Sequence, residues 1–213
     1  MAAGDPNRVI FLDVDGVLHP IGDHDLLPLG ADLDELSARA DEGIVHCGEL
    51  GHVTRVLKEE FLATCMGALL QIIEATDASI VLSTTWRKTT ADRAAVMAQL
   101  HAYGLAARVV GDTPRSGCRG GECREWLASN RPGGCAYAVL DDDEEGVLAV
   151  APSGNPHVPR SRFVCTVRAT GLTAQNAVAA IEMLQLPFGQ AEGDLPPVAN
   201  GMNAAARQML LCS

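Results

Sequence analysis

The chain has 213 residues and a formal net charge of −11 at pH 7, with 47% hydrophobic and 20% charged residues. This length and composition are typical of one folded domain and exclude a disordered chain. The acidic charge argues against strong autonomous binding to nucleic acid, which needs a basic face. The N-terminus has no apolar signal segment, and the apolar stretch from Phe61 to Ile73 is too short and too polar to span a bilayer. We therefore expect a soluble cytoplasmic protein without membrane contacts.

The first predicted element is a strand over residues 8–12, where Arg8 precedes the apolar run Val9-Ile10-Phe11-Leu12. An apolar run without alternation is typical of a central strand that is buried on both faces. Frequent Gly and Pro residues then interrupt residues 19–57. This segment is predicted to form loops with a short hairpin or helix, as a small lid over the first strand. A helix is predicted over 59–76, where apolar residues recur at helical spacing.

Strands and helices alternate through the rest of the chain. Further strands are predicted over 79–82, 108–110, 136–140 and 162–167, and further helices over 90–103, 121–129 and 173–184. Such alternation predicts an α/β domain in which helices cover both faces of a parallel sheet. The tail, residues 187–213, is rich in Gly, Pro, Ala and Asn, and the sequence assigns it no role.

Polar residues follow three of the predicted strands directly. Asp13 and Asp15 follow the first strand, Ser83 follows the second, and the pair Asp141-Asp142 follows the fourth. In a parallel sheet the functional crevice lies beyond the carboxyl ends of the strands, so these side chains are expected to meet there. Asp13 and Asp15 are two residues apart on an extended chain and can face one pocket. Neighbouring carboxylates are tolerated mainly where a cation lies between them or where one keeps its proton.

The sequence Asp13-Val14-Asp15-Gly16-Val17-Leu18 resembles the first motif of the haloacid-dehalogenase-like (HAD) superfamily of phosphatases. Together with the segments Phe11–Pro20, Ile80–Arg87 and Val139–Asp142, it resembles the HAD domain of Swiss-army-knife RNA repair proteins. The resemblance covers about residues 8–184. It implies a Rossmann-like HAD core of three α/β/α layers around a parallel sheet, with residues 19–57 inserted as a small cap.

The resemblance implies that Asp13 is the nucleophile that attacks phosphorus and forms an aspartyl-phosphate. Asp15 matches the general acid and base, which protonates the leaving oxygen and then activates water. Both roles suit a carboxyl group, because a carboxylate nucleophile divides one difficult displacement into two easier ones and a second carboxyl can transfer the proton. The presence of Asp15 favours hydrolysis of phosphate esters, because dehalogenases of this superfamily lack the acid.

Ser83 matches the second motif, a hydroxyl that hydrogen-bonds the transferring phosphoryl group, and Thr84 is the adjacent alternative. The alternative interpretation is that these hydroxyls cap the following helix, although a helix start can also bind phosphate. Arg87 lies one turn further along and is either a contact to the substrate phosphate or a structural residue.

The third motif is a basic residue that neutralises the phosphoryl oxygens, whose charge needs a fixed cation besides the metal. Arg119 is the first candidate, because it directly precedes the predicted helix over 121–129, and Arg115 is the second. The alternative interpretation is that both are solvated loop residues.

Asp141 and Asp142 match the fourth motif, which completes a Mg²⁺ site. Mg²⁺ prefers oxygen ligands and octahedral geometry and keeps several waters. The predicted protein ligands are a carboxylate of Asp13, the backbone carbonyl of Asp15 and a carboxylate of the Asp141-Asp142 pair. Asp142 is expected to bind directly, and Asp141 through water or as a neighbour of the ligands. The rest of the acidic run, residues 143–145, is predicted to be a solvated loop.

The sequence therefore predicts a Mg²⁺-dependent phosphomonoesterase that acts on a phosphorylated molecule. The resemblance makes a nucleic-acid end one candidate substrate, while the substrate and the oligomeric state stay open. Two alternatives remain: a catalytically silent binding or regulatory module on the same fold, and a phosphotransferase with the same aspartyl-phosphate. Trp86 is interpreted as a packing residue, and His19 as near enough to the first motif to reach the pocket.

Overall fold

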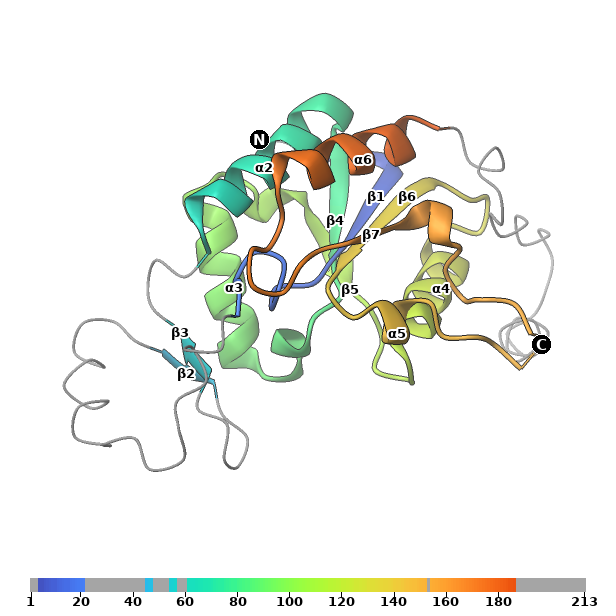
Figure 1. The fold of residues 1–213 in the computed structure, drawn as a ribbon, viewed down its shortest axis with the longest axis horizontal. Helices are drawn as coiled ribbons and strands as arrows, with labels where there is room; N and C mark the ends of the chain where they lie inside the picture. Colours follow the sequence, from blue (N-terminus) through green and yellow to red (C-terminus); the bar gives the residue numbers. More distant parts are fainter. Residues whose placement is uncertain (1–3, 22–44, 48–53, 57–60, 153, 187–213) are drawn as a thin grey trace.

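The computed structural model describes residues 4–21, 45–47, 54–56, 61–152 and 154–186, and a five-stranded sheet lies at its centre (Figure 1). The strands are β1 (Asp5–Leu12), β4 (Ala78–Leu82), β5 (Val109–Asp112), β6 (Ala136–Asp141) and β7 (Phe163–Cys165). Their order is β5-β4-β1-β6-β7, and every neighbouring pair is parallel. The predicted α/β class and parallel sheet are confirmed, and the first strand is the central one.

Helices cover both faces of this sheet, as Figure 1 shows. The longer helices are α2 (Ala63–Thr76), α3 (Thr90–Ala102), α4 (Arg119–Asn130) and α6 (Ala174–Gln185), and α5 (Glu144–Val147) is a single short turn. Three 3₁₀ turns complete the described elements: η1 (Thr85–Lys88), η2 (Ala106–Arg108) and η3 (Arg160–Arg162). Helices α2 and α6 lie side by side on one face, and α4 packs on the other.

The apolar run of β1 explains this layering. Its successive side chains point to opposite faces of the sheet. Ile10 and Leu12 pack into the core under α2, α3 and α6, whereas Val9 and Phe11 pack into the core under α4. All four side chains are fully buried. The run without alternation is thus a strand covered on both sides, which is what the sequence predicted.

Several of the predicted elements differ from the structure in type or extent. The helix predicted from residue 59 begins at Ala63, and the strand predicted from residue 8 begins at Asp5. Residues 143–145 are exposed, as predicted, but residues 144–147 form the helix α5 and not a loop, because the Asp143 side chain accepts a hydrogen bond from Gly146 N at 2.9 Å and caps the helix. Strand β7 ends at Cys165, two residues before the predicted end.

Most of the predicted lid lies outside the described residues. Within residues 19–57, β2 (Val45–Cys47) and β3 (Thr54–Val56) form an antiparallel pair. The tail, residues 187–213, also lies outside the described part of the chain. Among the described helices, none has the length and apolar character that crossing a bilayer requires.

Candidate active site

Three strand ends meet at the carboxyl edge of the sheet, and backbone hydrogen bonds continue past the strands there. Asp13 N donates to Leu140 O at 3.0 Å, and Ser83 N donates to Leu12 O at 2.8 Å. These bonds hold the residue after β1 against the end of β6 and the residue after β4 against the end of β1. The predicted meeting of Asp13, Ser83 and Asp141 follows from this register.

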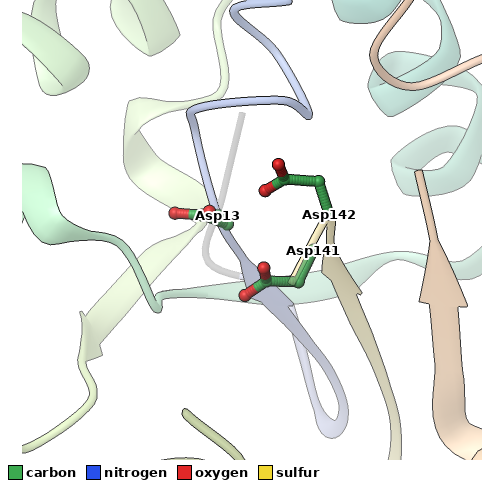
Figure 2. A group of neighbouring side chains, drawn as sticks. All are labelled: Asp13, Asp141 and Asp142. Carbon is green, nitrogen blue, oxygen red and sulfur yellow. The ribbon is translucent and has the colours of Figure 1, made fainter. Parts of the chain in front are cut away.

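The side chains of Asp13, Asp141 and Asp142 form an acidic cluster at this edge. Each offers a carboxylate oxygen, and the three oxygens lie within 4.8 Å of one another. Figure 2 shows Asp13 at the end of β1 and the other two at the end of β6, around one space. Asp13 is 4% exposed and Asp141 is fully buried, while Asp142 is partly exposed. The structure thus brings together three of the residues that the sequence predicted for a metal site.

Burial and mutual repulsion make ionisation of this cluster unfavourable. Burial first, and then the negative charge of Asp141, raise the pKa of Asp13 well above its ordinary value. Burial raises the pKa of Asp141 to about 6, although the positive charge of Arg119 acts in the opposite direction. Burial also raises the pKa of Asp142. Such shifts indicate that the cluster has more negative charge than the protein alone compensates.

Arg119 is the cation nearest to the centre of the cluster. It is the first residue of α4, and its Nε lies 3.1 Å from Asp141 Oδ2 while its Nη2 lies 3.7 Å from Asp13 Oδ2. Its Nη1 also donates to Ser83 O. Burial opposes the charged form, but Asp13 and Asp141 raise the pKa of the guanidinium, so it remains protonated. The second candidate, Arg115, is exposed and donates to Lys88 O at 3.3 Å.

Ser83 and Thr84 are both fully buried directly after β4. Ser83 Oγ lies 3.7 Å from Cys123 Sγ of α4, at hydrogen-bonding distance for sulfur. Thr84 Oγ1 accepts a hydrogen bond from Trp86 N at 3.3 Å and caps η1. Thr84 therefore has the capping contact that the sequence allowed, and Ser83 N is held by the end of β1.

Arg87 is surrounded by protein groups and does not extend into solvent. Its Nη2 lies 2.5 Å from Glu122 Oε2 of α4, and both side chains are more than 90% buried. The guanidinium also donates to the backbone oxygens of Thr84, Thr113 and Pro114. Of the two interpretations that the sequence left open, these contacts favour the structural one.

Asp15 points to two aromatic side chains and lies outside the acidic cluster. Its Oδ2 accepts a hydrogen bond from Trp86 Nε1 at 2.9 Å, and its Oδ1 lies 3.1 Å from His19 Nδ1. The sequence placed His19 near the pocket but interpreted Trp86 only as a packing residue. No spacing rule relates residue 86 to residue 15, because their contact depends on the packing of β4 beside β1.

Gly16 lets the loop after β1 pass close to Asp142. Its φ is +72°, a conformation that favours glycine, and a Cβ atom there would lie 2.5 Å from Asp142 Cγ. Thr166, just after β7, donates from Oγ1 to Gly16 O at 2.7 Å. The loop is thus fixed between the ends of β6 and β7.

A divalent cation fits this donor set. Oδ1 of Asp13 is buried and accepts no hydrogen bond from the described residues. Carboxylate oxygens are the ligands that Mg²⁺ prefers, and a bound cation would offset the repulsion within the cluster. Asp142 has a partial counter-charge in Arg168, whose Nε lies 3.8 Å from Asp142 Oδ2 and whose side chain is 63% exposed. The cluster can therefore hold a metal ion, whose identity the residues alone do not fix.

Comparison with known proteins gives one family. The model of the HAD domain in Swiss Army Knife RNA repair proteins matches residues 9–177, which include all the site residues above and the central sheet except the first four residues of β1. Among curated proteins, none matches the chain significantly.

Proposed function

The chain belongs to the family of HAD domains found in Swiss Army Knife RNA repair proteins, and on this premise we propose that it is a Mg²⁺-dependent phosphomonoesterase. The observation that carries the proposal is the position of Asp13. Its carboxylate is buried, has one oxygen that accepts no hydrogen bond within the described part of the chain, and lies between two further carboxylates and a fixed guanidinium. Such an oxygen suits both a metal ligand and a nucleophile aimed at phosphorus.

In this proposal Mg²⁺ is held by carboxylates of Asp13 and Asp142 and by the backbone carbonyl of Asp15. Asp141 acts beside the ion, because its Oδ1 accepts a hydrogen bond from Asp143 N at 2.9 Å and its Oδ2 lies 3.1 Å from Arg119 Nε. When bound, the ion supplies positive charge that offsets the negative charge of the cluster and of the phosphoryl oxygens.

In the first step, Asp13 acts as the nucleophile. A carboxylate oxygen of Asp13 forms a bond to phosphorus, and the bond between phosphorus and the ester oxygen breaks. Asp15 in its protonated form gives its proton to that oxygen, so the alcohol leaves and an aspartyl-phosphate remains. The departing oxygen is a poor leaving group without this proton, which is why a second carboxyl near Asp13 is useful.

In the second step, Asp15 acts as the base. Its carboxylate takes a proton from water while the water oxygen bonds to phosphorus and the bond between phosphorus and the Asp13 oxygen breaks. Inorganic phosphate leaves, Asp13 is again a free carboxylate, and Asp15 carries the proton for the next cycle. Asp15 thus begins the second step as the carboxylate that the first step leaves, and begins the next cycle with the proton that the second step supplies.

Ser83 and Arg119 are proposed to bind the phosphoryl group. Ser83 lies at the end of β4 beside Asp13, and Arg119 reaches both Asp13 and Asp141. A fixed cation and a hydroxyl donor stabilise the charge that spreads over the phosphoryl oxygens in the transition state. Thr84 remains the alternative hydroxyl and Arg115 the alternative cation, whereas Arg87 is assigned to holding η1 against α4.

The substrate class is a phosphate monoester, and a phosphorylated nucleic-acid end is the first candidate. The name of the matching family refers to RNA repair, which supports this choice. The net charge of −11 argues against tight binding of a long polyanion, so a short end or a small ester suits the chain better. A panel of phosphorylated oligonucleotides and small phosphate esters separates these substrates, and transfer to an added alcohol that exceeds hydrolysis would indicate a phosphotransferase.

The central experiment compares Asp13→Asn with Asp143→Asn on an aryl phosphate, with and without Mg²⁺. Asp13→Asn keeps the size of the side chain but removes the nucleophilic carboxylate, so turnover should fall by several orders of magnitude. Asp143 caps α5, and Asn can also accept the hydrogen bond from Gly146 N, so this control should keep wild-type turnover. Near-wild-type activity of a folded Asp13→Asn variant would refute the proposal. If the wild-type protein is folded but inactive with every divalent ion, the result would favour the alternative of a catalytically silent binding or regulatory module.

A further inference from the structure

The side chain of Trp86 connects the loop after β4 to the carboxylate of Asp15. Trp86 Nε1 donates to Asp15 Oδ2 at 2.9 Å. The two residues lie on different elements: Trp86 is in η1, three residues after Ser83, and Asp15 is in the loop after β1. An indole N–H can donate to a carboxyl oxygen whether or not the carboxyl carries a proton, so this contact restrains the orientation of Asp15 in both steps of the proposed cycle.

Packing leaves the indole of Trp86 little freedom to move. The residue is 4% exposed, and its ring makes edge contacts with Phe61 and His19 at centroid distances of 6.4 and 6.2 Å. Its backbone N donates to Thr84 Oγ1, which fixes the start of η1. An indole N–H is a donor only and does not ionise in this pH range. Trp86 is therefore a fixed donor, whatever the protonation state of its neighbours.

Among the described residues, the other side-chain contact of Asp15 comes from within its own loop. Its side chain is 26% exposed, and its second contact comes from His19, four residues further along the same loop. His19 Nδ1 can donate or accept, depending on its tautomer. Without a donor from another element, the carboxyl could turn towards solvent by rotation about its side-chain bonds. Through Trp86, the orientation of the Asp15 carboxyl thus depends on the position of the loop after β4, which begins at Ser83 and is called the Ser83 loop below.

We propose that Trp86 is a positioning residue that orients the carboxyl of Asp15 for proton transfer to the leaving group. The inference rests on the proposed function, because Trp86 can have this role only if Asp15 is the general acid. Trp86 acts through Asp15 and does not contact the substrate. The attack of Asp13 on phosphorus does not need this contact, so the loss of the indole donor should affect protonation of the leaving oxygen selectively.

The first test compares Trp86→Phe with Trp126→Phe on two substrates. Phenylalanine keeps an aromatic ring but removes the N–H donor. For an alkyl phosphate, which needs its leaving oxygen protonated, we expect Trp86→Phe to lower kcat about 10- to 100-fold, part of the usual contribution of a general acid. For 4-nitrophenyl phosphate, whose leaving group is stable as an anion, the loss should be small. An equal loss on both substrates would refute the proposal.

Trp126 provides the matched control. It is the only other tryptophan of the chain, is 6% exposed, and packs in α4 against Phe11 with ring centroids 5.6 Å apart. Its substitution by Phe removes an indole from the core but no contact to Asp15. We expect Trp126→Phe to change kcat on the two substrates by the same factor. A selective loss on the alkyl phosphate in this variant would show that core disturbance alone produces the effect, against the proposal.

Asp13→Asn and Asp15→Asn separate failure of this inference from failure of the proposed function. Retained turnover in Asp13→Asn would refute the function itself. If Asp15→Asn loses activity mainly on the alkyl phosphate but Trp86→Phe does not, the acid is correct and the positioning role is wrong. If Asp15→Asn lowers turnover of both substrates equally, Asp15 is not the general acid, and the proposed role of Trp86 is then wrong as well.

A second test needs neither turnover nor a Trp86 variant. The two tryptophans of the chain give two indole N–H signals in a ¹H–¹⁵N spectrum. The Trp126→Phe variant keeps one of them, which is therefore the signal of Trp86. A hydrogen bond to a carboxylate moves an indole proton downfield. We therefore expect Asp15→Ala to move the Trp86 signal upfield and to leave the Trp126 signal in place. An unchanged Trp86 signal would show that the contact does not exist in solution and would overturn the proposal.

Discussion

At the scale of single residues, the backbone of Gly16 lies close against the side chain of Asp142. Gly16 has a φ of +72°, and a Cβ atom there would lie 2.5 Å from Asp142 Cγ and 2.6 Å from its Oδ2. Both the backbone conformation and the missing side chain are therefore needed. A methyl group would either move Asp142 away from Asp13 or open the loop after β1.

We predict that Gly16→Ala weakens both Mg²⁺ binding and stability. The left-handed conformation alone costs a residue with a Cβ about 1–2 kcal/mol, and the displacement of Asp142 adds to this. Titration calorimetry with Mg²⁺ and urea unfolding measure the two effects. The control is Gly67→Ala in α2, where a Cβ atom meets nothing within 4 Å and alanine favours the helix by up to about 1 kcal/mol. Wild-type Mg²⁺ affinity in Gly16→Ala would contradict this account of Gly16.

The residues of the acidic cluster and the cation beside them, Arg119, could be predicted from the sequence, whereas the contacts of Trp86 and Arg87 could not. Asp13 and Asp141 directly follow apolar runs, so the strand ends place them at one edge of the sheet, with Asp142 next to Asp141. The contacts of Trp86 with Asp15 and of Arg87 with Glu122 join side chains 71 and 35 residues apart. Such contacts depend on side-chain directions after packing, which no local pattern encodes. The catalytic roles themselves stay predictions.

At the scale of elements, the strands were easier to predict than the short helix α5. Strands β1, β4 and β6 each contain a continuous apolar run, and a polar residue directly follows that run, so their carboxyl ends are visible in the sequence. The ends of β5 and β7 are not marked in this way. The acidic run 143–145 was interpreted by its polarity as a loop. It also has the pattern of a helix start, with Asp143 as the cap and Glu144 and Glu145 in the first turn, where negative charge is favourable.

One buried ion pair joins the element that follows Ser83 to the helix that carries Arg119. Nη2 of Arg87 in η1 lies 2.5 Å from Oε2 of Glu122 in α4, and the two side chains are 6% and 9% exposed. Glu122 lies one helical turn after Arg119, so the pair fixes the start of α4 beside the Ser83 loop. Removal of one member leaves the other charge buried without compensation, which is more costly than loss of an exposed pair.

We predict that Glu122→Gln lowers the free energy of unfolding by about 3–5 kcal/mol, because Arg87 stays buried without its counter-charge. Urea unfolding followed by circular dichroism gives the value. The control is Glu144→Gln, which removes the exposed contact of Glu144 with Arg160 at 3.9 Å and should cost no more than about 1 kcal/mol. Equal effects in the two variants would mean that the Arg87–Glu122 pair does not hold η1 against α4.

At the scale of the whole molecule, the strand order determines where the site lies. Alternation of strands and helices predicted a parallel sheet, but the order of the strands depends on how each crossover packs, which periodicity does not reveal. With β1 between β4 and β6, the residue after β1 has a strand end on each side. Asp13 therefore lies between the Ser83 loop and the Asp141-Asp142 pair, at the centre of the edge and not at its margin.

This central position couples the stability of the fold to pH. The pKa of Asp141 is raised from 3.8 to about 6, and that of Asp13 is raised in the same direction, so the folded protein keeps protons that the unfolded chain has released. The stability contributed by these groups is fully present below their ordinary pKa of 3.8 and is lost as the pH rises through about 6 for Asp141. A bound cation replaces the protons, so it should compensate this loss.

We therefore predict that Mg²⁺ stabilises the protein more at about pH 8 than at about pH 5. At an Mg²⁺ concentration near 100 times its Kd, the gain at the higher pH should be about 2.7 kcal/mol, or a rise of roughly 5–10 °C in Tm for a chain of this size. Thermal unfolding with and without Mg²⁺ at both pH values measures it. Asp142→Asn should remove the rise, whereas Asp143→Asn, which changes a neighbouring carboxylate outside the cluster, should keep it. Two outcomes would contradict this prediction: a rise in Tm of equal size at both pH values, or a rise that persists in Asp142→Asn. Either would mean that Mg²⁺ binds elsewhere on this acidic molecule. The stabilisation would then not come from neutralising the negative charge of Asp13, Asp141 and Asp142 at the centre of the sheet edge.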